Sequence, residues 1–175
     1  IYSLILWTVF DLSLNYNHAI RSRIKWMSST LTLLIFLMIL SGGLVAGTRA
    51  GIPFPTWPLM GDTFIPPQIY SMNPSWLSAF EDMATIQFNH RMFAYLLTIL
   101  IVIFAIVLLR SNVPRSLKNG TTALLFVLSL QVALGISTLI FYIPIPVAAA
   151  HQVGAIALLS VSLFITHSCL SREQI

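Results

Sequence analysis

One apolar run decides the fold: residues 86–109 read IQFNHRMFAYLLTILIVIFAIVLL. Arg91 is the only residue in this run that carries a full charge at neutral pH. A helix needs roughly 20 consecutive, mostly apolar residues to cross the hydrocarbon core of a bilayer. The run Ile86–Leu109 is long enough, so the sequence predicts a transmembrane helix here.

Three other runs have a similar length and composition: Ser28–Gly47, Thr121–Tyr142 and Val147–Cys169. Of the 175 residues of the chain, 57% are hydrophobic and 8% are charged, whereas roughly a quarter of the residues of an average soluble protein are charged. We therefore predict an all-α, polytopic membrane protein that crosses the lipid bilayer as a four-helix transmembrane bundle.

A fifth apolar run, residues 1–14, is too short to span a bilayer, and the chain begins without a methionine. We interpret this run as the end of a preceding, truncated transmembrane helix. The predicted parts of the chain are the end of this helix at 1–14, an inner basic loop at 15–27, a four-helix half-domain at 28–169 that contains an outer loop at 48–85, and an inner tail at 170–175.

The basic residues indicate the orientation in the membrane. If the four helices alternate in direction, seven of the nine basic residues fall on one side: Arg21, Arg23, Lys25, Arg110, Arg115, Lys118 and Arg172. An excess of lysine and arginine marks the side that is not translocated, so we place this side in the cytoplasm or the mitochondrial matrix. No nucleic-acid partner is predicted, because these residues lack the aromatic interleaving or the recognised module of a nucleic-acid-binding surface.

The predicted outer loop, residues 48–85, contains six of the nine prolines together with Trp57, Tyr70 and Trp76. Dense prolines exclude one long helix, and long loops without regular structure are uncommon unless they are functional. We expect a structured cap in which Asn73 is the N-cap and Pro74 the first position of a short interfacial helix.

Small residues favour close contacts between helices. Gly43, Gly47 and Gly51 recur at every fourth position, which allows another backbone to approach closely in lipid. Each of the last two runs carries a further stripe of small and polar residues. In Thr121–Tyr142 the stripe is Gln131, Gly135, Thr138 and Tyr142, and in Val147–Cys169 it is Gly154, Ala155 and Ser162.

Two histidines are predicted to lie at the same depth. His90 is four residues into its apolar run and His151 is four residues into its own, and both runs are expected to begin at the outer side. At 1.5 Å per residue, each lies about 6 Å below the start of its helix. An ionisable residue in a membrane helix needs polar partners that lipid does not supply, so the two imidazoles could clasp the iron of a haem between helices.

Simpler interpretations stay open for these residues. Either histidine could bond a neighbouring helix instead of a metal. Zinc fits less well than haem, because it takes three or four ligands and no cysteine or carboxylate lies at this level. His167 is 16 residues beyond His151, too far to share its site, and we expect it and His18 to be ordinary polar residues of the inner side.

Two arginines lie near the predicted outer boundary. Arg49 and Arg91 could pair with the propionates of a haem through bidentate hydrogen bonds. Alternatively, each could extend toward water or lipid phosphate.

Five sequence blocks resemble the haem A synthase family, and in order they are SGGLVAGTRAG at 41–51, TWPLMG at 56–61, QFNHR at 87–91, QVALGIST at 131–138 and PVAAAHQ at 146–152. The resemblance covers nearly the whole chain. Haem A synthase is a membrane enzyme of cytochrome oxidase assembly, built from two similar four-helix halves. The chain resembles the carboxy-terminal half together with the end of the helix before it.

The resemblance implies a function for the two histidines. His90 and His151 would be the axial ligands of a b-type haem, while the amino-terminal half receives the substrate haem O and oxidises a ring methyl group to the formyl group of haem A. Oxidation of an unactivated methyl group requires a redox cofactor, and the electron donor is not identified by the sequence. Some relatives carry a cysteine pair in the outer loops, but residues 48–85 contain no cysteine.

Two other functions fit the same residues. A b-type cytochrome that only transfers electrons would use the same two ligands, and a structural or assembly subunit would bind no haem. We expect an integral membrane location, with the bacterial cytoplasmic membrane favoured over the mitochondrial inner membrane.

Overall fold

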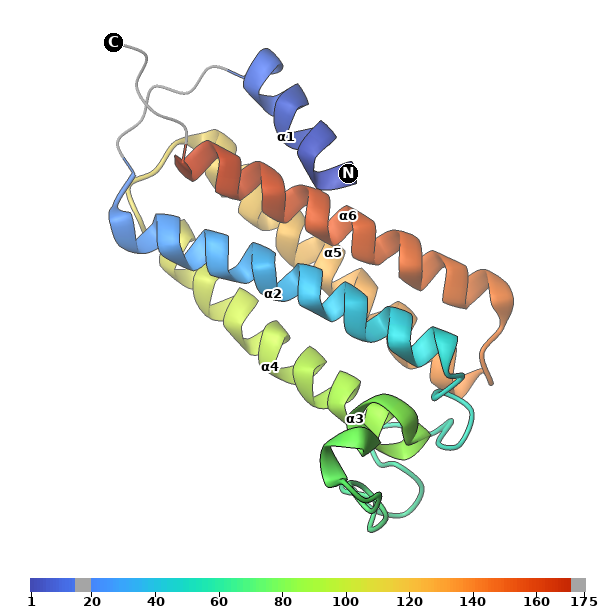
Figure 1. Cartoon of the computed structure of the whole chain (residues 1–175). Coiled ribbons are helices and arrows are strands. Elements are labelled where there is room, and N and C mark those ends of the chain that lie inside the picture. The colour runs from blue at the N-terminus through green and yellow to red at the C-terminus, as the bar shows by residue number, and fades with distance from the viewer. Residues whose placement is uncertain (15–19, 171–175) are drawn as a thin grey trace. The chain divides into compact units, whose positions relative to one another are not determined.

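A computed structural model of the chain describes residues 1–14 and 20–170 (Figure 1). His18 and Arg172 lie outside the described residues. The helices are α1 (Tyr2–Ser13), α2 (Ser22–Gly47), the 3₁₀ helix η1 (Ser75–Leu77), α3 (Ser78–Glu81), α4 (Met83–Leu109), α5 (Arg115–Ile140) and α6 (Ile145–Leu170). Four of them, α2, α4, α5 and α6, are long and apolar enough to cross a membrane. The predicted all-α fold with four membrane-spanning helices is confirmed.

The long helices begin earlier than the apolar runs that predicted them. α2 begins at Ser22 instead of Ser28, and α5 begins at Arg115 instead of Thr121. The first turns of these helices contain basic residues, whose long side chains reach toward water while their backbone stays helical. Hydropathy therefore marks the apolar part of each helix and misses its polar start.

The carboxyl end of α5 is closed by two residues in the left-handed conformation, Tyr142 (φ 59°) and Ile143 (φ 60°). The Ile143 amide donates to the carbonyl of Thr138 at 2.7 Å, as in a Schellman motif. Tyr142, predicted as part of a helical stripe, therefore lies beyond the helix and is exposed.

The packing divides the chain into two compact units, and the first comprises residues 1–36, 97–129 and 156–175. Its core consists of large aliphatic and aromatic side chains that are almost fully buried, and they include Ile35, Ile101, Phe104, Leu108, Leu117, Leu124 and Ile165. A hydroxyl cluster joins α2 to α6 within this unit: Thr32 Oγ1 lies 2.6 Å from Ser162 Oγ and 2.8 Å from Thr166 Oγ1. Hydroxyl hydrogen bonds of this kind hold apolar helices together.

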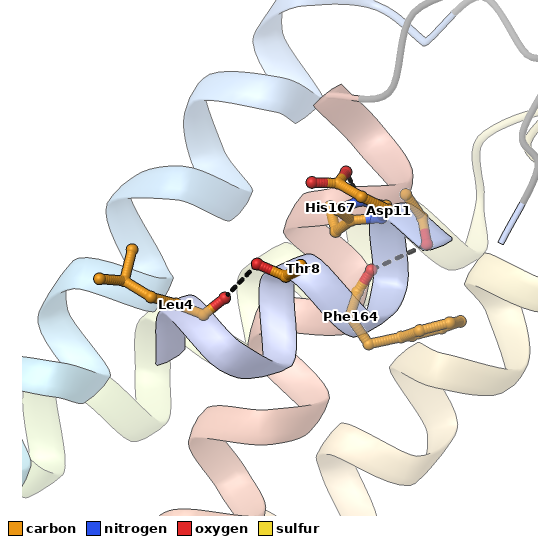
Figure 2. Close-up of polar contacts among 6 residues, drawn as sticks. Leu4, Thr8, Asp11, Phe164 and His167 are labelled. Atoms are coloured by element: carbon orange, nitrogen blue, oxygen red, sulfur yellow. Dashed lines mark hydrogen bonds and ion pairs between the residues drawn. The ribbon is translucent and has the colours of Figure 1, made fainter. Parts of the chain in front are cut away.

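Helix α1 packs on α6 within the first unit (Figure 2). His167 Nε2 donates to Asp11 Oδ1 at 2.7 Å, and the Trp7 ring meets the imidazole edge-on at a centroid distance of 4.9 Å. His167 is 2% exposed. His167, expected to be an ordinary polar residue of the inner side, has a buried side chain that pairs with α1.

The second unit comprises residues 37–96 and 130–155. It contains a folded connection between α2 and α4, residues 48–82, which we call the 48–82 loop. The loop ends three residues earlier than predicted because α4 already begins at Met83. Ala50, Met60 and Ser78 of the loop are buried, so it has a small core of its own.

The short helical segment predicted inside the loop exists, but its start was placed wrongly. Pro74 is the N-cap residue of η1, with an extended backbone, so Asn73 lies one position before the cap. η1 passes directly into α3 (Ser78–Glu81), and extended backbone at Asp82 separates α3 from α4.

Candidate functional site

His90 lies on α4 in the second unit, seven residues after Met83. Its Nδ1 is hydrogen-bonded to Ser41 Oγ of α2 at 3.1 Å. The edge of the ring lies against the next residue of α2: a Cβ atom added to Gly42 would be 3.4 Å from His90 Cε1. The ring is thus fixed by one hydroxyl group and by the close approach of a glycine backbone.

His151 lies on α6 in the same unit, six residues after Ile145. Its Nδ1 donates to the backbone carbonyl oxygen of Gln131 on α5 at 3.1 Å. A Cβ atom added to Gly135, one turn further along α5, would be 2.9 Å from His151 Cε1. Real side chains do not approach so closely, so this position of the ring requires glycine at 135.

The two imidazoles are held in the same way. Each bonds through Nδ1 to an adjacent helix and lies against a glycine of that helix. In the part of the chain that the structure describes, no hydrogen bond engages Nε2 of either His90 or His151. Because the bond made by one imidazole nitrogen sets the state of the other, both rings can present Nε2 as a metal ligand.

The helix starts differ from the predicted ones, yet the two histidines keep similar depths. Their distances from the starts of α4 and α6 are seven and six residues, a rise of about 10 and 9 Å. The rise counted from the helix starts exceeds the predicted depth of about 6 Å, which was counted from the starts of the apolar runs, because both helices begin before those runs.

The second unit offers a donor set that suits a haem iron. Residues 37–47, 130–140 and 145–155 include no fully buried residue, and both histidines are only partly buried. Neither ring is therefore fully enclosed by side chains of these segments. Among residues 1–14 and 20–170, no group of three or more His, Cys, Asp or Glu side chains could hold a metal ion. Two imidazoles suit the axial positions of a haem iron, whereas zinc takes more protein ligands.

Arg91 is buried and bonds to the 48–82 loop. Its guanidinium donates to the backbone carbonyls of Thr56 at 2.7 Å, Phe54 at 3.0 Å and Leu59 at 3.2 Å. Gln87, one turn earlier on α4, donates to the same carbonyl of Phe54 at 2.9 Å. The Arg91 side chain thus contacts the loop instead of extending toward water or lipid phosphate. Its Nε has no hydrogen-bond partner, so the predicted propionate contact is not tested by these bonds.

Arg49 is exposed and lies just past the end of α2. The amide of Ala50 donates to the carbonyl of Val45 at 3.0 Å, and the amide of Arg49 to that of Ala46 at 3.3 Å. This is a Schellman motif in which Arg49 has φ 57°, at a position that usually holds glycine. Its side chain makes no hydrogen bond to the described residues of the loop, so a propionate contact by Arg49 stays a prediction.

The predicted packing role of the glycine stripe holds for one of its members. A Cβ atom on Gly51 would be 3.1 Å from Ile143 Cδ1, but Gly43 and Gly47 have no neighbour within 4 Å of an added Cβ. Gly154, predicted to leave room for a porphyrin, instead accommodates the Gln131 side chain, with which an added Cβ would collide. Periodic spacing identified small residues but not which neighbours they meet.

Several residues of the site were not found from the sequence. Ser41 and Gly42 lie in the first of the five sequence blocks, but nothing in their spacing pairs them with a histidine 49 positions away. Gln87 and Arg91 are one helical turn apart, which predicts a shared face, but not that the face binds a loop.

The family of the chain follows from comparison with known proteins. A family model described as cytochrome oxidase assembly protein (COX15-CtaA) matches residues 1–163. No solved structure matches the chain.

Individual relatives agree with the family model. A protein named haem A synthase from Nitrosospira multiformis is 40% identical over 172 residues, which cover 95% of this chain and 48% of that protein. A protein of the same name from Paracoccus denitrificans is 38% identical, over 95% of this chain and 45% of that protein. Haem A synthase COX15 of Bos taurus is 39% identical over 75% of this chain and 32% of its own length. The chain spans about half the length of its bacterial relatives, and it belongs to the COX15-CtaA family of cytochrome oxidase assembly proteins.

Proposed function

We propose that this chain is the carboxy-terminal, haem-binding half of a haem A synthase, and that His90 and His151 bind the iron of a b-type haem. The observation that carries the proposal is the arrangement of the two imidazoles in the second unit. Each is held through Nδ1, by Ser41 Oγ or by the carbonyl of Gln131, and each has Nε2 available for a metal.

In this proposal, the residues around the two imidazole rings orient them and contact the haem. The carbonyl of Gln131 orients His151 and raises its basicity as a ligand, as bonds to the second nitrogen of metal-binding histidines do. Gly42 and Gly135 let the two rings lie against the backbones of α2 and α5. Arg49, exposed at the end of α2, is the candidate partner for a propionate.

A bound haem would supply one-electron transfer. Because His90 and His151 would both bind the iron, an electron-transfer role suits this half better than oxygen activation. The proposed reaction of the whole protein oxidises a methyl group of haem O to the formyl group of haem A. We place the haem O site and further catalytic residues in an amino-terminal half. We place the protein in the bacterial cytoplasmic membrane rather than the mitochondrial inner membrane. Its electron donor is not assigned.

The test is pigment analysis of membranes that contain this chain together with its amino-terminal half and are supplied with haem O. Haem A in the extracted pigment supports the synthase. Bound haem b without any haem A would instead support a cytochrome that only transfers electrons. A reduced-minus-oxidised spectrum without a b-type band would contradict both and leave a structural or assembly role.

A further inference from the structure

The turn of α4 that carries His90 is bonded to the 48–82 loop at several points. Arg91 is 6% exposed and Gln87 is 2% exposed, and together their side chains donate to three backbone carbonyls of the loop. A charge that is removed from water needs partners, and for the Arg91 guanidinium the loop carbonyls are those partners. The loop and this turn of α4 therefore share one hydrogen-bond network.

Further contacts lie before and after His90 on the same helix. The hydroxyl of Tyr70 donates to Asn89 Oδ1 at 3.0 Å, and the Tyr70 amide donates to Thr85 Oγ1 at 3.0 Å. The rings of Phe64 and Tyr95 stack at a centroid distance of 6.5 Å. The loop is thus attached to α4 from Thr85 to Tyr95, and His90 lies within this stretch.

We infer that Arg91 is a positioning residue: it fastens the 48–82 loop to α4, and the fastened loop holds the turn of α4 from which His90 reaches Ser41. Only arginine suits the task, because its planar fork can donate to several carbonyls at once, whereas lysine offers a compact point charge. The part of the inference that concerns His90 as an iron ligand rests on the proposed function. The fastening of the loop does not.

A propionate role for Arg91 makes a different prediction from a loop-fastening role. A propionate contact can act only when haem is bound, whereas the bonds to Phe54, Thr56 and Leu59 exist without it. The behaviour of the loop in the haem-free protein therefore separates the two roles.

The experiment is hydrogen exchange of the full chain in detergent, with and without haem, comparing Arg91→Lys with the wild type. The matched control is Arg110→Lys, at an exposed arginine just past the end of α4. Loss of charge-assisted hydrogen bonds allows local opening, so amides of residues 52–62 should exchange roughly ten- to a hundredfold faster in Arg91→Lys. The acceleration should occur with and without haem, and Arg110→Lys should exchange like the wild type. Electron paramagnetic resonance of the ferric, haem-loaded Arg91→Lys protein should show shifted low-spin g values, because the His90 ring is less firmly oriented.

A second variant covers the case in which Arg91→Lys does not fold. Gln87→Leu removes one of the bonds to Phe54 and should accelerate exchange in the same amides by a smaller factor, roughly threefold to tenfold. Unchanged loop exchange in haem-free protein of the folded variant would overturn the inference, and so would haem loss as the sole effect. If the wild-type chain binds no haem, the proposed function fails while the exchange result still decides the role of Arg91.

Discussion

Nδ1 of His151 donates to the backbone carbonyl of Gln131 at 3.1 Å. A carbonyl oxygen only accepts hydrogen bonds, so Nδ1 carries the proton, and the lone pair of the neutral ring lies on Nε2. No side-chain substitution at position 131 removes this carbonyl. The orientation of His151 is consequently set by the backbone of α5, whereas that of His90 depends on the hydroxyl of Ser41.

Removal of either candidate ligand should empty the site. His90→Ala and His151→Ala are each expected to lower haem content to below about a tenth of the wild-type level, because one axial bond is lost. His167→Ala is expected to retain haem, since His167 belongs to the first unit. Haem per protein from the pyridine haemochrome spectrum measures the effect. Equal loss in all three variants would contradict the assignment of the ligands.

Gly135→Ala should displace the ring of His151. The new Cβ would be 2.9 Å from Cε1, and overpacking of this kind destabilises by about 1–3 kcal/mol. We expect a lower haem content and a lower melting temperature in detergent. Gly43→Ala is the control, because an added Cβ has no neighbour within 4 Å there and alanine favours the helix. A Gly135→Ala protein that binds haem like the Gly43→Ala protein would show that the ring does not need this glycine.

Ser41→Ala removes the only side-chain partner that the structure gives Nδ1 of His90. Loss of the hydrogen-bond partner of a metal-binding histidine typically lowers metal affinity about 10- to 100-fold. We expect weaker haem retention and a shifted midpoint potential, both measured on the purified chain by haem titration and redox potentiometry. Ser41→Thr keeps the hydroxyl and should restore both properties. Equal values for the Ala and Thr variants would contradict a role for the hydroxyl.

Asp11→Asn should weaken the attachment of α1 to α6. The bond to His167 involves a carboxylate that is 58% exposed, so solvent screening limits its contribution to about 1 kcal/mol. We expect a melting temperature lower by a few degrees with unchanged haem content, measured by thermal unfolding in detergent. The conservative Asp11→Glu should lie between the two. A loss of haem in Asp11→Asn would show that the first unit affects the site.

The sequence predicted the four spans because apolar length is a property of each segment alone. It missed the polar starts of α2 and α5, where helical backbone continues past the apolar residues. The two histidines could be singled out because imidazole is unusual in a membrane helix. Their partners could not, since Ser41 and Gln131 bond them across 49 and 20 positions of sequence. The partners of Arg91 could not be predicted either, because they are backbone carbonyls, which any residue type provides.

The left-handed backbone at Arg49 has a consequence for engineering the stability of this protein. A left-handed conformation costs an ordinary residue about 1–2 kcal/mol relative to glycine, so Arg49→Gly should relieve strain and raise heat resistance. The same exchange would delete the one exposed guanidinium at the end of α2. At position 49, thermal stability and the positive charge therefore compete. Selection for thermostability without an assay for bound pigment would favour variants that have lost the Arg49 guanidinium.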